Sequence, residues 1–372
     1  MKRLISYALI IVLAISSFTS CSSNAVSGEM RDITTMRLVR EMGVGINLGN
    51  TFDCSGDWIS KKVESVETAW GSPVVTEDMI KCCAEAGFGV MRLPVTWGTL
   101  ADENYNVDKE FMARIKEVVG WILDSGMYCI LNTHHDGWPE KFTEDFEGSL
   151  KKYENLWKQI SKEFKNYGDK LMFESMNEVG FDDIWNTYAG SEGKDQAFEM
   201  FNTINQTFVD TVRSSGGNNA SRHLLIASYW TSIERACDEM FKLPDDPANR
   251  MAVSVHYYGP STLTLISEDV SWGKAKTTWG SEEDYAELEM WLNMVEEELI
   301  EKDIPVIIGE YGCFGKNKTR EVRTQYMYDV ASYAYDRGIC PILWDTPGGE
   351  LNRDMAKFYY PEFIDRITNI PY

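Results

Sequence analysis

The sequence predicts an α/β protein with a (β/α)8 TIM barrel, and two observations carry this prediction. Short apolar runs typical of buried strands alternate with segments of helical periodicity, which is the pattern of a closed parallel barrel. The chain has 372 residues, 44% of them hydrophobic and 25% charged, and this length and composition fit one large globular barrel. The strand-like runs begin near Gly43, Gly89, Tyr128, Leu171, His223, Met251, Pro305 and Ile339.

The helical pattern between the strands is clearest in the segment after the fourth one. Its apolar residues recur at helical spacing up to a loop at residues 214–219; they are Phe198, Phe201, Ile204, Phe208 and Val212. A doubly wound open sheet is the alternative fold. It would require a glycine-rich phosphate loop after the first strand, and "GINLGNTFDCSG" does not contain one.

The N-terminus has the layout of a bacterial export signal. Met1-Lys2-Arg3 precedes an apolar stretch that is too short to span a bilayer comfortably, and Cys21 follows a small-residue segment that resembles a lipoprotein cleavage site. We therefore expect residues 1–20 to be a signal peptide, residues 21–30 a linker and residues 31–372 the folded domain. Lipidation of Cys21 would place the protein on the cell surface, and ordinary secretion is the alternative.

Net charge limits the classes of binding partner, and the cysteine content indicates whether disulfides form the framework. The formal net charge of −22 argues against nucleic acid and anionic lipid, so a lipid anchor would be the only contact with a membrane. The seven cysteines after Cys21 are an odd number without metal-type CxxC spacing. They predict small core residues rather than a disulfide framework. We expect a monomer.

Polar and aromatic side chains end nearly every strand-like run. In a barrel these ends meet at one mouth. Glu178 and Glu310 are the most informative, because two carboxylates from separate strands are what glycoside hydrolysis requires. The full set is Asn47, Asn50, Arg92, Trp97, His134, His135, Asp136, Asn177, Glu178, Trp230, His256, Tyr258, Glu310, Trp344 and Asp345.

This set resembles glycoside hydrolase family 5, a group of retaining (β/α)8 β-glycanases that need no cofactor. The motifs "RLPVTW", "LNTHHD", "SMNE", "VHYY", "IIGE" and "ILWD" carry the resemblance, and "GINLGNTF", "ETAWGSP" and "TTWGSE" resemble its subfamily 4. The resemblance implies that Glu178 is the acid/base and Glu310 the nucleophile. It also implies substrate-binding or positioning roles for Arg92, His134 with His135 beside it, Asn177, His256, Tyr258 and Trp344. Asn47, at the end of the first strand-like run, is a further candidate for substrate binding.

The chemistry of that family sets expectations for the two carboxyl groups. Glu178 must be protonated when the bond breaks, so we expect a raised pKa. Glu310 must stay ionised, which a cation at Arg92 and a phenol at Tyr258 would favour. Arg92 could also neutralise Glu174, and both roles can hold together.

The alternative to a sugar-binding role for the histidines is a metal site. Adjacent histidines on a strand point to opposite faces, so we do not expect His134 and His135 to share a metal ion. We expect no metal at the site.

Most tryptophans fall at strand ends and in the loops that follow. Indole rings at these positions are suited to stacking on the apolar faces of a bound sugar. Trp279, in "TTWGSE", is a candidate for stacking, with core packing as the competing explanation. We expect a retaining endo-β-1,4-glucanase acting on a β-glucan polysaccharide. The alternatives are an endo-xylanase or mannanase of the same fold, a non-catalytic glycan-binding lipoprotein, and a metal-dependent barrel hydrolase.

Overall fold

The computed structural model describes residues 28–137, 141–181, 184, 191–314 and 316–370. The expected signal peptide at residues 1–20 and the expected lipidation site Cys21 lie outside this range, so both remain expectations. Within the described range, no helix combines the length and the apolar character that a bilayer span would need.

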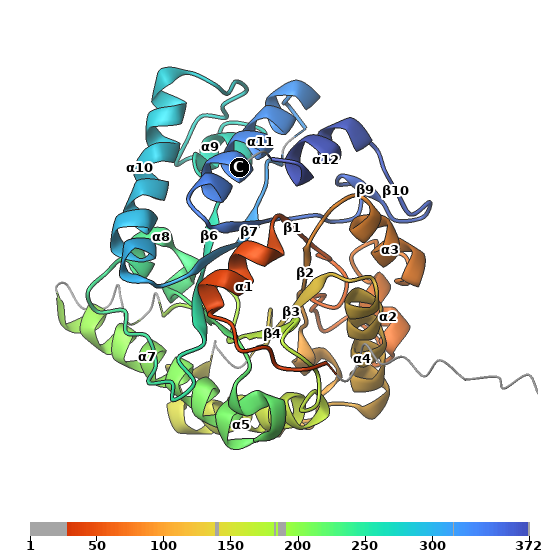
Figure 1. Cartoon of the computed structure of the whole chain (residues 1–372), viewed down its shortest axis with the longest axis vertical. Coiled ribbons are helices and arrows are strands. Elements are labelled where there is room, and N and C mark those ends of the chain that lie inside the picture. The colour runs from red at the N-terminus through yellow and green to blue at the C-terminus, as the bar shows by residue number, and fades with distance from the viewer. Residues whose placement is uncertain (1–27, 138–140, 182–183, 185–190, 315, 371–372) are drawn as a thin grey trace, which may run out of the picture.

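Eight parallel strands close into a barrel in the order of the sequence, as predicted (Figure 1). Each strand begins within two residues of an expected run. The strands are β1 Gly45–Asn47, β2 Val90–Leu93, β3 Tyr128–Asn132, β4 Leu171–Glu174, β5 Leu224–Ala227, β6 Met251–Tyr257, β7 Val306–Tyr311 and β8 Cys340–Leu343. All but one of their residues are buried, which explains why they read as continuous apolar runs.

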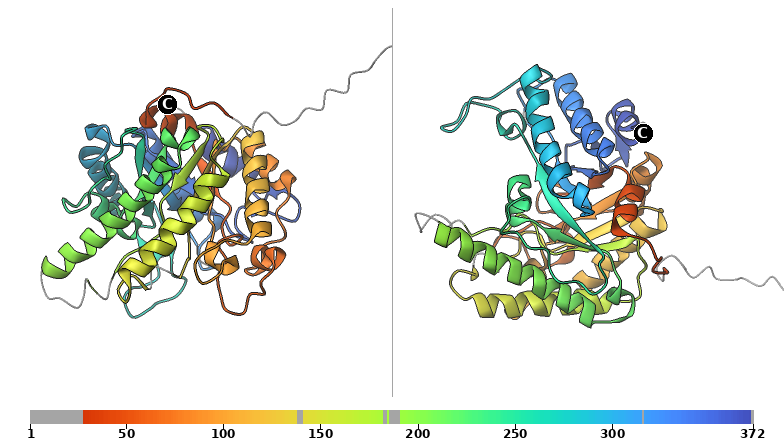
Figure 2. Two further views of the ribbon diagram at one scale, coloured as in Figure 1. Left: turned by 90° about the horizontal axis from the view of Figure 1, so that it is seen from below. Right: turned by 60° about the vertical axis from the view of Figure 1, so that its left-hand side comes forward.

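Helices surround the barrel, and α5 and α7 lie side by side along one flank (Figure 2). The apolar stripe predicted between Phe198 and Val212 is the buried face of α7. The helices are α1 Thr35–Met42, α2 Val63–Thr68, α3 Glu77–Glu85, α4 Lys109–Asp124, α5 Phe146–Glu163, α7 Ser191–Ser214, α8 Ile233–Ala236, α9 Ser261–Thr264, α10 Glu282–Glu298, α11 Arg320–Asp336 and α12 Pro361–Thr368. A two-stranded sheet, β9 Leu351–Asn352 and β10 Lys357–Phe358, follows the barrel.

The N-terminal end of the barrel is closed by α1 (Figure 1). Leu38, Val39 and Met42 on this helix pack against residues of the barrel interior such as Val90 and Ile342. The opposite end, where the strands finish, is therefore the end that is left for a substrate. The seven cysteines of the described chain are free thiols, five of them buried, as the sequence predicted.

A break in strand register shapes the end of β7. Val255 pairs with Ile308 but His256 pairs with Glu310, so Gly309 is the extra residue of a β-bulge. A Cβ atom at Gly309 would lie 3.1 Å from both the His256 ring and the Ser254 hydroxyl, so a side chain would crowd this position. The bulge turns Glu310 towards the barrel mouth, because one added residue reverses the side-chain alternation of a strand.

Candidate active site

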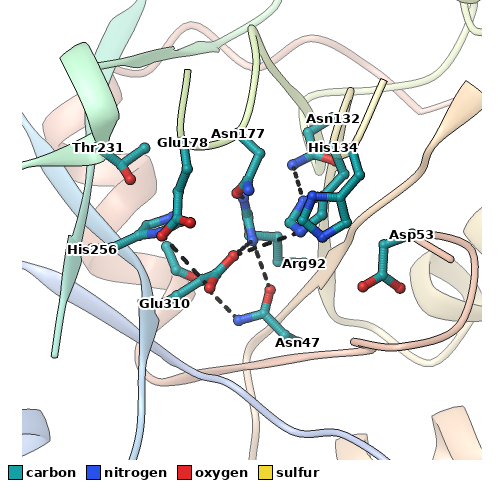
Figure 3. Close-up of polar contacts among 12 residues, drawn as sticks. Asn47, Asp53, Arg92, Asn132, His134, Asn177, Glu178, Thr231, His256 and Glu310 are labelled. Carbon is teal, nitrogen blue, oxygen red and sulfur yellow. Dashed lines mark hydrogen bonds and ion pairs between the residues drawn. The ribbon is translucent and has the colours of Figure 1, made fainter. Parts of the chain in front are cut away.

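Two glutamates meet at the mouth of the barrel (Figure 3). Glu178 follows the end of β4, and Glu310 lies in β7. One carboxylate oxygen of each and a ring nitrogen of His256 all lie within 4.8 Å of one another. The Glu178 side chain is 43% exposed, whereas the Glu310 side chain is only 7% exposed. One carboxyl group can thus meet incoming solvent while its neighbour is held inside the protein.

Arg92, which is fully buried in β2, contacts four polar residues from three other parts of the barrel, namely β1, β4 with the turn that follows it, and β7. Its Nη1 donates to Glu310 at 2.8 Å and to the Asn47 side chain at 3.1 Å. Its Nη2 donates to the Asn177 side chain at 2.8 Å, and its Nε donates to Glu174 at 2.7 Å. Both roles expected for Arg92 are therefore present: it holds Glu310 and it neutralises Glu174.

Further contacts of the two carboxyl groups come from the end of β6 and the residue that follows it. The Tyr258 hydroxyl donates to Glu310 at 3.0 Å. His256 Nδ1 lies 2.8 Å from Glu178 and 3.7 Å from Glu310. Asn47 donates to the carbonyl of Gly309 at 2.9 Å, so it also holds the bulge that aims Glu310.

An aromatic row runs along one side of the site. The Trp344 ring stacks on His134 at 5.8 Å and an interplanar angle of 6°. The rings of His134 and His135 are 4.3 Å apart, and Trp70 lies 5.8 Å beyond His135. The expectation that the two histidines face apart was wrong, because β3 ends at Asn132 and strand alternation does not extend to them.

The pKa shifts of the free protein run opposite to our expectation. Burial raises the pKa of Glu178, but the hydrogen bond and charge of His256 lower it by more than burial raises it. The pKa of Glu178 is therefore below its ordinary value. Burial and the charge of Glu178 raise the pKa of Glu310 beyond what His256 and Arg92 offset. Burial, with Glu310 alongside, keeps the pKa of Tyr258 well above its ordinary value, so this phenol remains a donor.

The structure brings together Asn47, Arg92, His134, His135, Asn177, Glu178, His256, Tyr258, Glu310 and Trp344, which are all the predicted catalytic and substrate-binding residues except Trp279. That indole lies between α10 and α11, where its Nε1 donates to Asp329 at 2.8 Å and its ring packs edge-on against Tyr326 at 4.9 Å. Tyr285 packs on the same ring. This placement favours the competing explanation, packing between helices, over the stacking hypothesis.

Two buried residues of the site, Asn132 and Ser254, were not predicted, and Glu174 was expected only as a partner of Arg92. Asn132 donates to Glu174 at 3.0 Å and to His134 Nδ1 at 3.2 Å, and the Ser254 hydroxyl donates to Glu174 at 2.7 Å. All three are fully buried inside apolar strands. A polar residue within such a run was the available signal, since a buried polar group needs a partner.

Two clusters at the site have the residue types of metal ligands. They are Asp53 with His134 and His135, and Glu178 with His256 and Glu310. In the first cluster Asp53 already accepts the backbone N–H groups of Asn50 and Thr51. His134 Nδ1 is occupied by Asn132, so the first cluster is poorly suited to hold a cation. In the second, hydrogen bonds from Arg92, Tyr258 and His256 already occupy the carboxylates.

Comparison with known proteins decides the family. Residues 52–349 match the model of the cellulase family, glycosyl hydrolase family 5. The chain belongs to glycoside hydrolase family 5. Endoglucanase A of Ruminococcus albus is 36% identical over 356 residues, which cover 93% of this chain and 94% of the relative.

Solved structures of other family 5 members superimpose closely. A subfamily 4 broad-specificity endoglucanase from an uncultured bovine rumen ciliate has a TM-score of 0.83 and 38% identity, covering 91% of this chain and 98% of its own. A family 5 lichenase from Caldicellulosiruptor sp. F32, in complex with cellotetraose, has a TM-score of 0.83 and 32% identity, covering 93% and 97%. This family 5 chain is therefore a glycoside hydrolase of the cellulase type.

Proposed function

We propose that this protein is a retaining endo-β-1,4-glucanase that hydrolyses internal bonds of β-glucans by double displacement. The observation that carries the proposal is the short separation of the Glu178 and Glu310 carboxylates, whose nearest oxygens are within 4.8 Å. Retaining glycosidases place their two carboxyl groups about 5–5.5 Å apart, whereas inverting enzymes leave about 6.5–9.5 Å for a water molecule. The distance here leaves no room for that water.

In the first step Glu310 would attack the anomeric carbon and Glu178 would protonate the departing glycosidic oxygen. The hydrogen bonds from Arg92 and Tyr258 hold the Glu310 carboxylate in one orientation, so little rearrangement is needed before attack. In the second step Glu178 would take a proton from water, which then displaces Glu310 from the glycosyl intermediate. Its larger exposure suits the residue that must meet both the leaving sugar and the incoming water.

The lowered pKa of Glu178 in the free protein fits this cycle once substrate is bound. A polysaccharide lying over the exposed Glu178 side chain would remove water from it, and burial favours the neutral carboxylic acid. When Glu310 becomes esterified its negative charge is lost, and Glu178 then ionises more easily as the second step requires. The same group can thus serve as acid and then as base.

The substrate class follows from the row formed by Trp70, His135, His134 and Trp344. Flat ring faces suit the apolar faces of equatorial β-linked sugars. The relatives named as endoglucanases, and the lichenase with bound cellotetraose, support a β-1,4-glucan or mixed-linkage glucan. The exposure of His135 and Glu178 fits a site open to internal stretches of a polymer.

The test compares carboxymethyl-cellulose, barley β-glucan, xyloglucan and xylan under one set of conditions. We expect viscosity of the soluble β-glucans to fall well before much reducing sugar appears, and the β-anomer to appear first by NMR. Preferential cleavage of xylan would favour the alternative endo-xylanase activity of the same fold. An α-anomer formed first would refute retention.

We further propose that the enzyme acts outside the cell, because its polymeric substrate cannot cross a bacterial envelope. The export-like leader and Cys21 support this, with either a lipid-anchored or a secreted product. Mass spectrometry of the mature N-terminus in wild type and Cys21→Ala distinguishes the two. A lipidated Cys21 that disappears in the variant supports anchoring, and an unmodified N-terminus in wild type supports secretion.

A further inference from the structure

Glu174 is a second buried carboxylate below the catalytic pair. It ends β4, the strand that leads to Glu178, and its side chain is fully buried. Its Oε2 accepts from Arg92 Nε at 2.7 Å and from Asn132 Nδ2 at 3.0 Å, and its Oε1 accepts from the Ser254 hydroxyl at 2.7 Å. Residues of three other strands, β2, β3 and β6, therefore converge on this one side chain.

The bond to Arg92 determines what the rest of the guanidinium can do. A guanidinium is planar and its donors have fixed directions. With Nε held by Glu174, Nη1 is directed to Glu310 and Nη2 to Asn177, and the structure shows both bonds at 2.8 Å. Glu174 thus sets the orientation of the cation that holds Glu310.

The bond to Asn132 determines the protonation of His134. The Asn132 carbonyl oxygen accepts the backbone N–H of Val95 at 3.2 Å, and its amide nitrogen faces Glu174. A flipped amide would place its oxygen against the Glu174 carboxylate, so the amide has one orientation. Its nitrogen then donates to His134 Nδ1, which must be unprotonated. Burial lowers the pKa of His134 well below its ordinary value, so the ring is neutral and its proton lies on Nε2.

From these contacts we propose that Glu174 is a positioning residue that prepares two groups of the site together. Through Arg92 it orients Glu310, and through Asn132 it presents His134 as an Nε2–H donor to a hydroxyl group of the bound sugar. The second role rests on the proposed function. Nε2 lies 4.0 Å from the nearest Glu310 oxygen, so one hydroxyl group of the sugar, placed beside this pair, could hydrogen-bond to both atoms.

The single positive charge of Arg92 is paired with two carboxylates, those of Glu174 and Glu310. Both pairs are buried, with nitrogen to oxygen distances of 2.7 and 2.8 Å. Removing one negative charge leaves Arg92 to Glu310 alone, which favours the ionised form of Glu310. The other titratable groups that face Glu310 are unchanged by that substitution; they are His134, Glu178, His256 and Tyr258.

The first test needs no variant of Glu174. With 15N-labelled histidine the spectrum holds the signals of four residues, and His134→Gln assigns the one in question. We expect His134 to show a protonated Nε2 and an unprotonated Nδ1 from pH 5 to pH 8, without titration. A protonated Nδ1, or a titration in that range, would overturn the proposal even if no Glu174 variant folds.

The second test is the pH profile of Glu174→Gln. A glutamine can accept from Arg92 and Asn132 through its oxygen and donate to Ser254 through its nitrogen, so it removes the charge and keeps every contact. We expect the acidic limb of kcat/KM on aryl cellobioside to move about one pH unit lower. Ionisation of the nucleophile sets that limb in the proposed mechanism.

Glu67→Gln is the matched control. Glu67 is equally buried and pairs with Arg114 at 2.7 Å, but it lies on α2 outside the site. We expect it to lower the melting temperature and leave the acidic limb where wild type has it. If both variants lower the melting temperature and neither moves the limb, Glu174 is merely structural. Failure of wild type to hydrolyse β-glucans would refute the proposed function, whereas the histidine spectrum decides the positioning contacts separately.

Discussion

Replacement of Arg92 by methionine should affect stability and catalysis through the same lost charge. Arg92 is fully buried and donates four hydrogen bonds, to Glu174, Glu310, Asn47 and Asn177. Methionine fills most of the volume but leaves two buried carboxylates without a counter-charge. Breaking a buried ion pair by removing one partner costs about 3–5 kcal/mol.

The expected change in melting temperature follows from the size of the domain. A chain with roughly 340 folded residues has an unfolding entropy of about 0.7 kcal/mol per kelvin, so 3–5 kcal/mol corresponds to a loss of about 4–7 °C. The kinetic effect should be larger. The charge of Arg92 lowers the pKa of Glu310 against the effect of burial, so without it a smaller fraction of the nucleophile is ionised. The rate on an aryl cellobioside at neutral pH should fall on the order of 100-fold.

Scanning calorimetry and the burst of phenol release measure the two effects separately. Arg92→Lys is the control, since it keeps the charge but replaces the planar fork by three donors on one nitrogen. It should lose less stability than Arg92→Met and keep part of the burst. A melting temperature within about 1 °C of wild type for Arg92→Met, or equal losses in both variants, would refute the reasoning.

Three further outcomes are expected. Glu310→Gln should abolish formation of the glycosyl-enzyme on every substrate, whereas Glu178→Gln should still form it when the leaving group is an acidic phenol; equal loss in both would contradict the assigned roles. Burial lowers the pKa of His223 from 6.5 to about 3. This neutral histidine therefore contributes stability that is present above pH 6.5 and is lost as the pH falls towards 3. His223→Asn, which can still hydrogen-bond to Thr35, should lose about 2 kcal/mol less than wild type between pH 6.5 and 4.5 in urea denaturation, and parallel losses would exclude His223 as the cause. Trp279→Ala should lower the stability by about 2–4 kcal/mol while activity per folded molecule stays unchanged, and weaker polymer turnover at an unchanged melting temperature would restore the stacking role.

The fold could be predicted from the sequence because each barrel strand is buried on both faces and is therefore a short, nearly continuous apolar run. All eight strands appear as apolar runs, and the polar residues that interrupt or end them mark the mouth. Motif resemblance placed Arg92, His256 and Glu310 at that mouth, and the structure brings them together. Position at the strand ends, together with the motif resemblance, was thus enough to predict most of the site residues.

What the sequence did not reveal depends on contacts between distant segments. Trp279 follows β6 in the chain, as a cleft residue would, but its partners Asp329 and Tyr326 belong to α11, and no local pattern shows that pairing. The side-by-side rings of His134 and His135 depend on where β3 ends. The pKa order of the two carboxyl groups depends on His256, whose distances to them only the closed barrel defines.

The unequal exposure of the two carboxyl groups leads to one more expectation, about pH. Glu310 is already buried and held by Arg92 and Tyr258, so substrate binding changes its surroundings little. Glu178 is the exposed partner, and a bound polysaccharide would replace the water around it. Because burial disfavours a carboxylate, the pKa of Glu178 should be higher in the complex than in the free enzyme. The limbs of kcat report the complex and those of kcat/KM report the free enzyme, and in each case they belong to the coupled pair of carboxyl groups. A higher pKa of Glu178 in the complex should therefore move the basic limb of kcat to higher pH than that of kcat/KM. The comparison requires a substrate with a sugar leaving group, since an acidic phenol leaves without protonation. Coincident limbs, or a limb of kcat at lower pH, would mean that substrate does not dehydrate Glu178, and the proposed change from acid to base would then need another cause.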